Sequence, residues 1–444
     1  MVRQPLILPT DTSISPERLL VTSSRKAGLL LVFVTVFIDL LGFGIVLPLL
    51  PRYGESFQAS GLQIGLLMAS LSAMQFLFAP VWGRMSDRVG RRPILILGLA
   101  GSTVSYAMFG YATSLGIDGQ LLGQSALTWL FITRIGAGIA GATIPTAQAY
   151  IADITGPQER AKGMALIGAA FGIGFTFGPL LGAFFVSDVQ GADPTPMPGY
   201  VAAIISGCAL LFAIFKLPES LKPDSKPSER HWFDIGSFRA AMSHPHVGKV
   251  LATMFLTTFA FGQFEATLSL LTERLGLSQQ DNFYVFAYIG FVLTLSQGFL
   301  VRRLVPKLGE FRMGLAGVSL MALGLAAIAL VATDGTTAQL YAVLPIVVVG
   351  FSATTPSLQS MLSLSSSESE QGGILGLGQS MSAMARILGP FIGLTLFDIG
   401  KNHALPYWCG AGLMLFSLLA VLRLRTAGFK PSGPNEESAE QMPV

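Results

Sequence analysis

Two carboxyl groups stand inside long apolar stretches of this 444-residue chain. Asp39 shares a helical face with Gly42, and Glu265 belongs to a polar stripe whose members are spaced by three and four residues. The stripe consists of Thr258, Gly262, Glu265, Ser269 and Thr272. Apolar surroundings disfavour the charged form of a carboxyl group, so such an acid can bind and release a proton near neutral pH. Both acids are therefore candidates for proton coupling, and the alternative is a hydrogen-bonded acid that serves packing alone.

Two arginines lie in similar apolar stretches. Arg134 shares a face with Gly138 and Gly141, which let a neighbouring helix come close enough to pair with it. Arg386 belongs to a second polar stripe, where it could contact a substrate, a counter-ion or a buried structural partner. This stripe consists of Gln379, Ser382, Arg386, Gly389 and Gly393. The candidate lining of a substrate cavity is Gln263, Glu265, Gln297, Gln359, Gln379 and Arg386, although one interhelical hydrogen bond would explain any single glutamine.

The elements that must position these residues are membrane-spanning helices. Hydrophobic residues make up 51% of the chain, charged residues only 12%, and the mean hydropathy is +0.61. Twelve apolar segments each approach the ~20 residues needed to cross a bilayer. They cover residues 27–50, 61–82, 93–114, 126–151, 163–186, 198–217, 248–272, 283–301, 312–332, 338–361, 373–397 and 405–424. The sequence thus predicts an all-α membrane protein with twelve transmembrane helices.

The distribution of basic residues predicts the orientation in the membrane. Of the 28 Lys and Arg residues, 23 fall on the side that holds both tails and three on the opposite side, in loops at Arg52, Arg274 and Lys401. Both termini should therefore face the cytoplasm, in an integral multi-pass protein of a bacterial inner (plasma) membrane. The net charge of +3 follows from this topology and gives no reason to expect nucleic acid binding.

An internal repeat divides the chain into two halves. GATIPTAQAYI (141–151) aligns with SATTPSLQSML (352–362) at an offset of 211, and GPLLG (178–182) aligns with GPFIG (389–393) at the same offset. The helices should therefore form two pseudo-symmetric halves of six. The predicted divisions are a disordered cytoplasmic tail (1–24), an N-terminal half (25–217), a cytoplasmic linker with a short amphipathic helix (218–247), a C-terminal half (248–425) and a second disordered tail (426–444).

Three stretches of the first half carry a family resemblance. They are IDLLGFGIVLPLLP (38–51), APVWGRMSDRVGRRPIL (79–95) and AYIADITGPQERAKGMALIGAAFGIGFTFGPLLG (149–182). The chain resembles the major facilitator superfamily, in particular its twelve-span drug/proton antiporters and, among these, tetracycline-efflux carriers. The resemblance implies alternating access, with Arg134 beside the proton-coupling site. Those carriers place an aspartate where this chain has Ser105, so the resemblance does not extend to tetracycline as the substrate.

The turn after the second span concentrates charge in GRMSDRVGRR (83–92). Its glycines permit close approach of backbones, and Asp87 can accept charge-assisted hydrogen bonds from an arginine or a helix N-terminus. The resemblance implies that Asp87 latches one conformational state, whereas the arginines alone would serve a positive-inside turn. In the second half Pro306 replaces the aspartate, so the latch should be asymmetric. The expected gating residues are Gly83, Asp87, Arg88, Gly90, Arg91 and Arg92.

A further motif, in the fifth span, resembles the antiporter signature. It consists of Gly174, Gly178, Pro179 and Gly182. The small residues allow tight helix contact and Pro179 favours a kink, although close packing alone would explain the glycines equally well.

The motifs favour a transporter over an enzyme. No catalytic residue, metal site or cofactor is expected, and no Walker sequence supports an ATP-driven pump. The expected partners are protons, the lipid bilayer and a small amphipathic substrate, for a chain that acts as a monomer. The first hypothesis is proton-coupled export of cationic or zwitterionic drug-like compounds. A proton-coupled carrier of a physiological metabolite and a non-transporting membrane scaffold are the alternatives, and the polar stripes argue against the scaffold.

Overall fold

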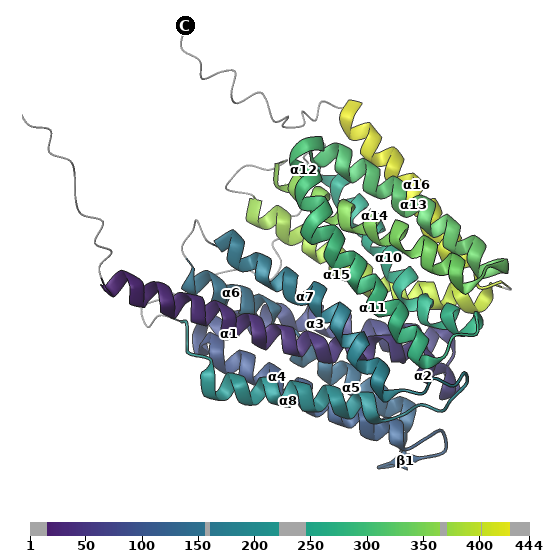
Figure 1. Cartoon of the computed structure of the whole chain (residues 1–444), viewed down its shortest axis with the longest axis horizontal. Helices are drawn as coiled ribbons and strands as arrows, with labels where there is room; N and C mark the ends of the chain where they lie inside the picture. The colour runs from purple at the N-terminus through teal and green to yellow at the C-terminus, as the bar shows by residue number, and fades with distance from the viewer. Residues whose placement is uncertain (1–15, 156–159, 222–245, 365–370, 401, 427–444) are drawn as a thin grey trace, which may run out of the picture.

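The computed structural model describes residues 16–155, 160–221, 246–364, 371–400 and 402–426 (Figure 1). The predicted amphipathic helix of the linker and the second tail lie outside these residues, apart from Thr426. The first tail differs from the prediction, because a helix begins at Pro16 and residues 16–24 are helical. Proline suits the first position of a helix, where no backbone N–H is needed.

In the part of the chain that the structure describes, twelve helical segments are long and apolar enough to cross a membrane. They run Gly28–Ser56, Gly61–Val89, Arg91–Ser114, Ala126–Ile154, Leu166–Phe185, Met197–Lys216, Val247–Arg274, Gln279–Leu308, Glu310–Asp334, Thr337–Leu364, Ile374–Ile399 and Leu405–Arg423. The twelve predicted spans are confirmed, and several extend further than expected. The first span continues through Ser56 and so includes Arg52, which the prediction placed in a loop.

Several spans consist of more than one element. The first half contains α1 (Pro16–Val46), η1 (Leu47–Leu49), α2 (Leu50–Ser56), α3 (Gly61–Val89), α4 (Arg91–Ser114), β1 (Gln120–Leu121), β2 (Gln124–Ser125), α5 (Ala126–Ala140), α6 (Ile144–Ile154), α7 (Arg160–Gly182), η2 (Ala183–Phe185) and α8 (Met197–Lys216). The second half contains α10 (Val247–Arg274), α11 (Gln279–Leu295), the π-helical η3 (Ser296–Val301), α12 (Arg302–Leu308), α13 (Glu310–Asp334), α14 (Thr337–Leu364), α15 (Gln371–Ile399) and α16 (Leu405–Thr426). Prolines at the starts of η1, α2 and α6 account for the breaks in the first and fourth spans, because proline has no backbone N–H to continue a helix.

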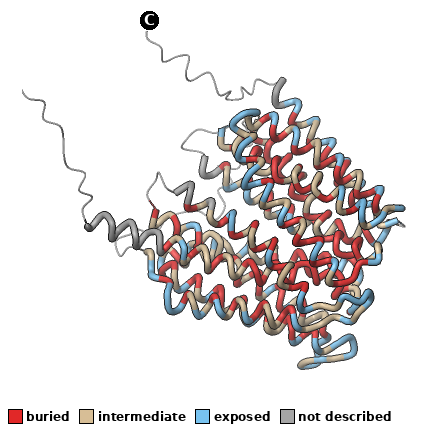
Figure 2. Tube along the Cα trace, in the orientation of Figure 1, coloured by how far each residue is buried: buried red, intermediate tan, exposed pale blue. Residues whose placement is uncertain are grey.

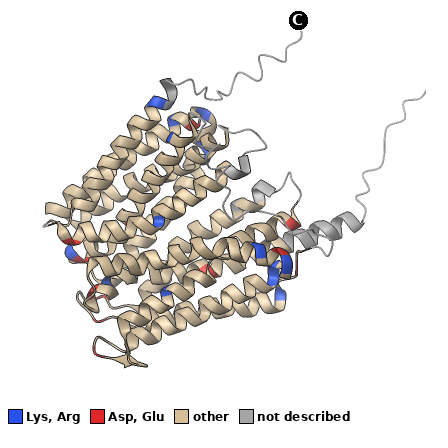
Figure 3. Ribbon diagram, turned by 180° about the vertical axis from the view of Figure 1, so that it is seen from behind, with Lys and Arg blue, Asp and Glu red and all other residues tan. Residues whose placement is uncertain are grey.

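The two ends of the molecule are distinguished by their connections (Figure 1). β1 and β2 form a small antiparallel hairpin at one end, where Gln120 pairs with Ser125 and Leu121 with Gln124. We call this end the hairpin side. α1 begins and α16 ends at the opposite end, which we call the termini side. Figure 3 shows that basic and acidic residues gather at the ends of the helices and that few lie within the spans.

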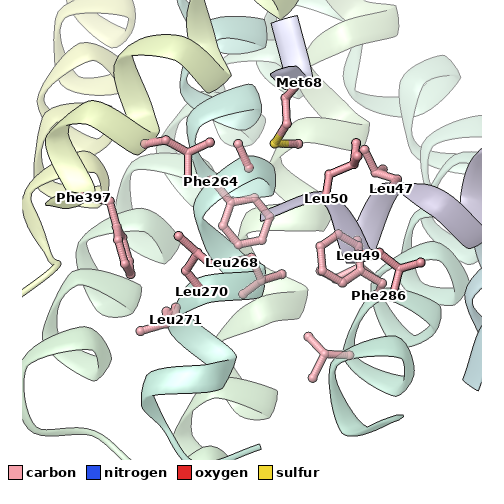
Figure 4. Packing of buried hydrophobic residues seen from close by; sticks show 14 of the residues in the cluster. Leu47, Leu49, Leu50, Met68, Phe264, Leu268, Leu270, Leu271, Phe286 and Phe397 are labelled. Atoms are coloured by element: carbon pink, nitrogen blue, oxygen red, sulfur yellow. The ribbon is translucent and has the colours of Figure 1, made fainter. Parts of the chain in front are cut away.

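The two halves share one apolar core on the hairpin side and have separate cores on the termini side. The shared core includes Leu50 and Met68 of the first half together with Phe264 and Phe286 of the second (Figure 4). Toward the termini side, one cluster around Tyr150 belongs to the first half, and distinct clusters belong to the second. Within each half, buried residues lie where helices face one another, and exposed residues lie on the outside (Figure 2). The halves are therefore joined on the hairpin side and diverge toward the termini side.

Two pairs of helices form the seam between the halves. α3 packs against α15, and α11 packs against α7. A Cβ at Gly65 of α3 would lie 2.7 Å from the Phe391 Cα of α15, and a Cβ at Gly290 of α11 would collide with the Phe175 carbonyl of α7. Glycine at these two positions lets the backbones of opposite halves touch.

Candidate functional site

Asp39 lies on α1, near the middle of the first span, and is partly buried. Its carboxyl group is beside Ser102 of α4 and Ser206 of α8. The Oδ1 atom is buried and has no hydrogen-bond partner among the described residues. The carboxyl group therefore has polar neighbours that can stabilise either its charged or its neutral form, which is the arrangement that exchange of a proton requires.

Arg134, on α5, is the buried cation of the first half. Its side chain is 2% exposed, and its Nε and Nη1 atoms have no hydrogen-bond partner in the part of the chain that the structure describes. The guanidinium carbon lies 6.0 Å from the centre of the Phe43 ring on α1, within the range of a cation–π contact. Arg134 thus faces the same interior as Asp39, from the opposite side of the six-helix bundle.

Glu265 and Arg386 are the charged residues inside the second half. Glu265 lies on α10 and Arg386 on α15, and their charges interact across the contact between these two helices. Glu265 is partly buried, whereas the Arg386 side chain is exposed in the middle of its span. The two polar stripes expected from the sequence are therefore brought together. The exposed guanidinium is accessible to a further anion or hydrogen-bond acceptor.

The candidate glutamines divide into two groups. Gln297 and Gln379 are exposed and Gln359 is partly buried, although all three lie within spans. Gln263 is fully buried, and both polar atoms of its amide lack a hydrogen-bond partner among the described residues. Its side chain fills the space beside Gly393 of α15, so it lies inside the helix packing of the second half.

The charged turn between α3 and α4 is held within the first half. Asp87 accepts a hydrogen bond from Arg91, which also donates to the Ser86 hydroxyl over 2.7 Å. The Nε atom of Arg91 lies 3.1 Å from the Asp153 carboxylate at the end of α6. Arg88 is exposed. The turn thus ties α3, α4 and α6 together through a single buried guanidinium.

Glu219 closes the turn from the end of α8. Its carboxylate accepts hydrogen bonds from the backbone N–H groups of Arg91 and Arg92, over 2.9 and 3.1 Å. Gly90, with φ of +114°, makes room for this carboxylate, because a Cβ there would collide with it. A carboxylate at a helix N-terminus is stabilised by the unpaired N–H groups and the helix dipole. The sequence-based prediction of the gating residues did not include Glu219 and Asp153, although both are acids at span ends on the side rich in arginine.

The equivalent turn of the second half uses different chemistry. Gly309 has a positive φ of +78°, and so does its counterpart in the first half, Gly90. Pro306 occupies the position of Asp87, and the Arg303 guanidinium carbon lies 3.8 Å from the centre of the Phe299 ring. The backbone geometry is thus repeated, while among the described residues the acid–arginine contact is found in the turn of the first half.

The glycine motif of the fifth span packs α7 against α1. A Cβ at Gly178 would lie 2.9 Å from the Gly44 Cα, and one at Gly174 would lie 3.0 Å from the Leu40 Cβ. The repeat-related Gly389 of α15 packs in the same way against α10, because a Cβ there would lie 2.9 Å from the Phe259 carbonyl oxygen. Gly182 instead lies against Phe283 of α11, which belongs to the other half. Three glycines thus serve packing within a half, and Gly182 adds to the seam between halves.

Arg52 joins the two halves on the hairpin side, a role that was not predicted from the sequence. The side chain is 5% exposed. Its Nε atom donates to the Ser269 carbonyl over 3.1 Å, Nη1 to the Leu277 carbonyl over 3.2 Å and Nη2 to the Thr272 hydroxyl over 2.9 Å. Glu273 lies 3.6 Å from Nε and supplies a nearby negative charge. Every acceptor belongs to the second half.

A second set of hydrogen bonds surrounds Arg52. The Pro48 carbonyl of the first half accepts from the Ser269 hydroxyl over 2.8 Å and from the Asn282 amide over 3.1 Å. We call Pro48, Arg52, Ser269, Thr272, Leu277 and Asn282 the hairpin-side lock.

The termini side shows the opposite situation. Four glycines here have free space where a Cβ would lie. Apart from the adjacent residues and backbone of the same helix, no described heavy atom lies within 4 Å of that position. These glycines are Gly83 of α3, Gly376 of α15, Gly168 of α7 and Gly298 of η3. These glycines lie on the same helix pairs that touch on the hairpin side. The seam between the halves is therefore closed on the hairpin side and open on the termini side.

Comparison with known proteins identifies relatives across almost the whole chain. The model of the Major Facilitator Superfamily matches residues 32–390. The class C tetracycline resistance protein of Escherichia coli is 32% identical over 406 residues, which cover 89% of this chain and 96% of that protein. Multidrug resistance protein 2 of Bacillus subtilis (strain 168) is 27% identical over 403 residues, covering 89% and 94%. The crystal structure of the human organic anion transporter MFSD10 (TETRAN) is similar with a TM-score of 0.65 and 25% identity, over 89% of this chain and 99% of that one.

Proposed function

The chain belongs to the major facilitator superfamily, and on that premise we propose that it is a proton-coupled exporter of amphipathic, drug-like compounds. Membership makes it a multi-pass membrane transporter of small molecules. The observation that carries the finer proposal is the pair of acids inside the spans, Asp39 and Glu265. An ionisable group at membrane depth is costly, and a proton pathway or a substrate site is its usual reason.

The orientation proposed is with the termini side in the cytoplasm. The concentration of basic residues around the tails supports it, because positive loops are retained on the cytoplasmic side. The hairpin side then faces outward, in a bacterial inner membrane. In that frame, the hairpin-side lock closes the outer end and the separated glycines leave the inner end open, which is the state in which an exporter loads its substrate.

The transport cycle follows from competition between the proton and the substrate. An exporter driven by the inward proton gradient must lose its proton when it binds substrate inside and regain one when it releases substrate outside. A substrate whose cationic group neutralises Glu265 makes protonation of that acid unfavourable, and protonation in turn removes the attraction for the cation. Coupling therefore needs no direct contact between the proton and the substrate, because both compete for the negative charge of Glu265.

The remaining candidate residues receive roles in the same cycle. Gln297, Gln359 and Gln379 supply hydrogen bonds to polar groups of the substrate, while apolar and aromatic side chains bind its body. Asp87 accepts the Arg91 hydrogen bond in the inward-open state, and we assign it the role of stabilising the turn while the termini side opens and closes. Gly174 and Gly178 let α7 move with α1 as one unit.

The experiment that tests the proposal is transport into everted membrane vesicles. A proton gradient directed out of the vesicle, with a lipophilic cationic dye outside, should drive accumulation by the parent chain but by neither Asp39→Asn nor Glu265→Gln. A variant of an exposed acid outside the spans, Asp193→Asn, is the matched control and should accumulate dye normally. Accumulation that persists after the gradient is collapsed would exclude proton coupling.

Export of organic anions is a second candidate, and Arg386 favours it. Its guanidinium is exposed at mid-span and faces a single acid, so it can bind an anionic group of a substrate. The human relative whose structure is similar is described as an organic anion transporter. The same vesicles distinguish the two candidates: accumulation of a carboxylated dye that Arg386→Gln abolishes, with no accumulation of the cationic dye, would favour the anion exporter.

A further inference from the structure

Tyr106 occupies the centre of the first half without any role in the cycle described above. It lies on α4 and is 5% exposed. The ring rests against Gly42 of α1, where a Cβ would lie 3.0 Å from the ring atom Cε2. Gly42 follows Asp39 by three residues and shares its helical face. The tyrosine ring therefore lies next to the acid, in a space that only glycine at position 42 leaves open.

Arg134 also lies near Tyr106. α4 and α5 touch beside it, since a Cβ at Gly136 of α5 would lie 2.9 Å from the hydroxyl oxygen of Ser105. The guanidinium of Arg134 lies over Phe43, the residue that follows Gly42. Tyr106 interacts electrostatically with both Asp39 and Arg134. The phenol group thus lies close enough to interact with both the acid and the buried cation of this half.

The absence of a direct ion pair makes this position significant. Among the described residues Asp39 has no cation within ion-pair distance, and the Nε and Nη1 atoms of Arg134 have no acceptor. A direct pair between them would hold the acid in its charged form and oppose proton uptake. A phenol between the two transmits part of the positive charge, because a nearby cation polarises the O–H bond that points to the carboxylate.

We propose that Tyr106 is a positioning residue that couples Arg134 to Asp39 and thereby adjusts the proton affinity of the coupling acid. In the charged state of Asp39, the Tyr106 hydroxyl donates a hydrogen bond to the carboxylate. When Asp39 binds a proton from water, that hydrogen bond is weakened and the carboxyl group turns to the hydroxyls of Ser102 or Ser206. Tyr106 keeps its own proton throughout, and within the first half the proton that is taken up resides on Asp39.

The other helices around Asp39 present no competing charge in the described part of the chain. α4 presents Tyr106 with the uncharged Ser102, α8 presents Ser206, and α5 presents Arg134. α7 contacts α1 through glycines, and α6 contacts it through Tyr150 at Gly28, about three helical turns from Asp39. A shift in the pH dependence after a change at Tyr106 can therefore be traced to the chain from Arg134 to Asp39.

The test is the pH dependence of dye transport in everted vesicles, and it rests on the proposed proton coupling. Tyr106→Phe removes the hydroxyl and keeps the ring, so the charged form of Asp39 loses a hydrogen bond while packing is retained. We expect the midpoint of the transport rate to move to higher pH by about 1 unit, because a hydrogen bond to a charged group is worth roughly that much. Tyr111→Phe, on the same helix but 42% exposed, is the matched control and should keep the parent midpoint.

A double-variant cycle distinguishes coupling from a merely structural role. Arg134→Gln should also raise the midpoint, and it should raise it less in the Tyr106→Phe background, since the charge then has no phenol through which to act. A Tyr106→Phe variant that melts like the parent and keeps the parent midpoint would overturn the inference. Additive shifts in the double variant would overturn it as well.

The proposed function and this inference fail in different ways. If Asp39→Asn exports with the parent's dependence on the gradient, Asp39 is not the coupling acid and both proposals are wrong about this half. If Asp39→Asn is inactive while Tyr106→Phe has the parent's pH profile, proton coupling stands and only the role of Tyr106 is refuted.

Discussion

The Arg52 side chain leaves the first half of the molecule and donates a hydrogen bond from Nε to the Ser269 carbonyl of the second half over 3.1 Å. Two further hydrogen bonds from the same guanidinium reach Leu277 and Thr272. A planar guanidinium can satisfy several acceptors in fixed directions at once, which a lysine cannot do. The Arg52 side chain must therefore withdraw from these acceptors before the hairpin side can open.

The first prediction is that Arg52→Ala weakens closure of the hairpin side. The substitution leaves buried acceptors of the second half unpaired, so we expect a loss of stability of about 3 kcal/mol and a lower melting temperature. Spin labels at Asp188 and Asp334, which are exposed residues of the two halves, should show a longer distance distribution. Arg274→Ala is the control, because Arg274 is 53% exposed and its pair with Glu55 should contribute less than about 1 kcal/mol. Equal distances in parent and Arg52→Ala would remove Arg52 from the lock.

The second prediction separates the roles of the two acids. Asp39→Asn should reduce export of cationic and neutral compounds alike, because it removes coupling. Glu265→Gln should reduce export of cationic compounds more than that of neutral ones, because this acid lies opposite Arg386 and selects the substrate charge. Initial rates for a matched cationic and neutral pair of dyes measure the difference. Equal losses for the two dyes in Glu265→Gln would contradict this division.

The third prediction concerns the charged turn. Asp87→Asn should slow the exchange between inward-open and outward-open states at least several-fold. Substrate affinity should stay nearly unchanged, because Asp87 lies in the last turn of α3, away from the middle of the membrane spans. Asp153→Asn should act in the same direction, since it removes the other carboxylate bound to Arg91. Arg88→Gln, an exposed neighbour in the same turn, is the control. Transport rates of both variants equal to that of the parent would leave the turn with a topological role alone.

The fourth prediction concerns the seam between α7 and α11. Gly290→Ala should destabilise the state that is closed on the hairpin side by about 1–3 kcal/mol, because the added methyl group would collide with the Phe175 carbonyl. Gly298→Ala, at the open end of the same span, has free space around it and should leave stability unchanged in this state. Thermal melting of the two purified variants provides the comparison. A Gly290→Ala variant as stable as Gly298→Ala would show that the helices can move apart at no cost.

Sequence alone was sufficient for the spans, the two halves and the in-span charges of Asp39, Arg134, Glu265 and Arg386. An apolar run near 20 residues has one stable arrangement in a bilayer, because a helix satisfies every backbone hydrogen bond within the segment. The stripes around Glu265 and Arg386 were also predictable, since side chains three and four residues apart share a helical face. These features depend on neighbours in the chain and on the membrane, both of which are encoded locally.

Tertiary structure decided which of these charges meet and where the halves touch. Arg52 was assigned to a loop on sequence grounds, yet the first span continues past it and brings it within reach of Ser269, 217 positions along the chain. The Tyr106 ring lies against α1 only because position 42 is a glycine, and Glu219 caps α4 only because α8 ends beside it. Contacts of this kind depend on helix crossing angles and on small residues at the crossings, which many distant side chains determine together. For that reason the sequence determined which residues are available for coupling and gating, whereas the packing of the twelve spans decided their partners.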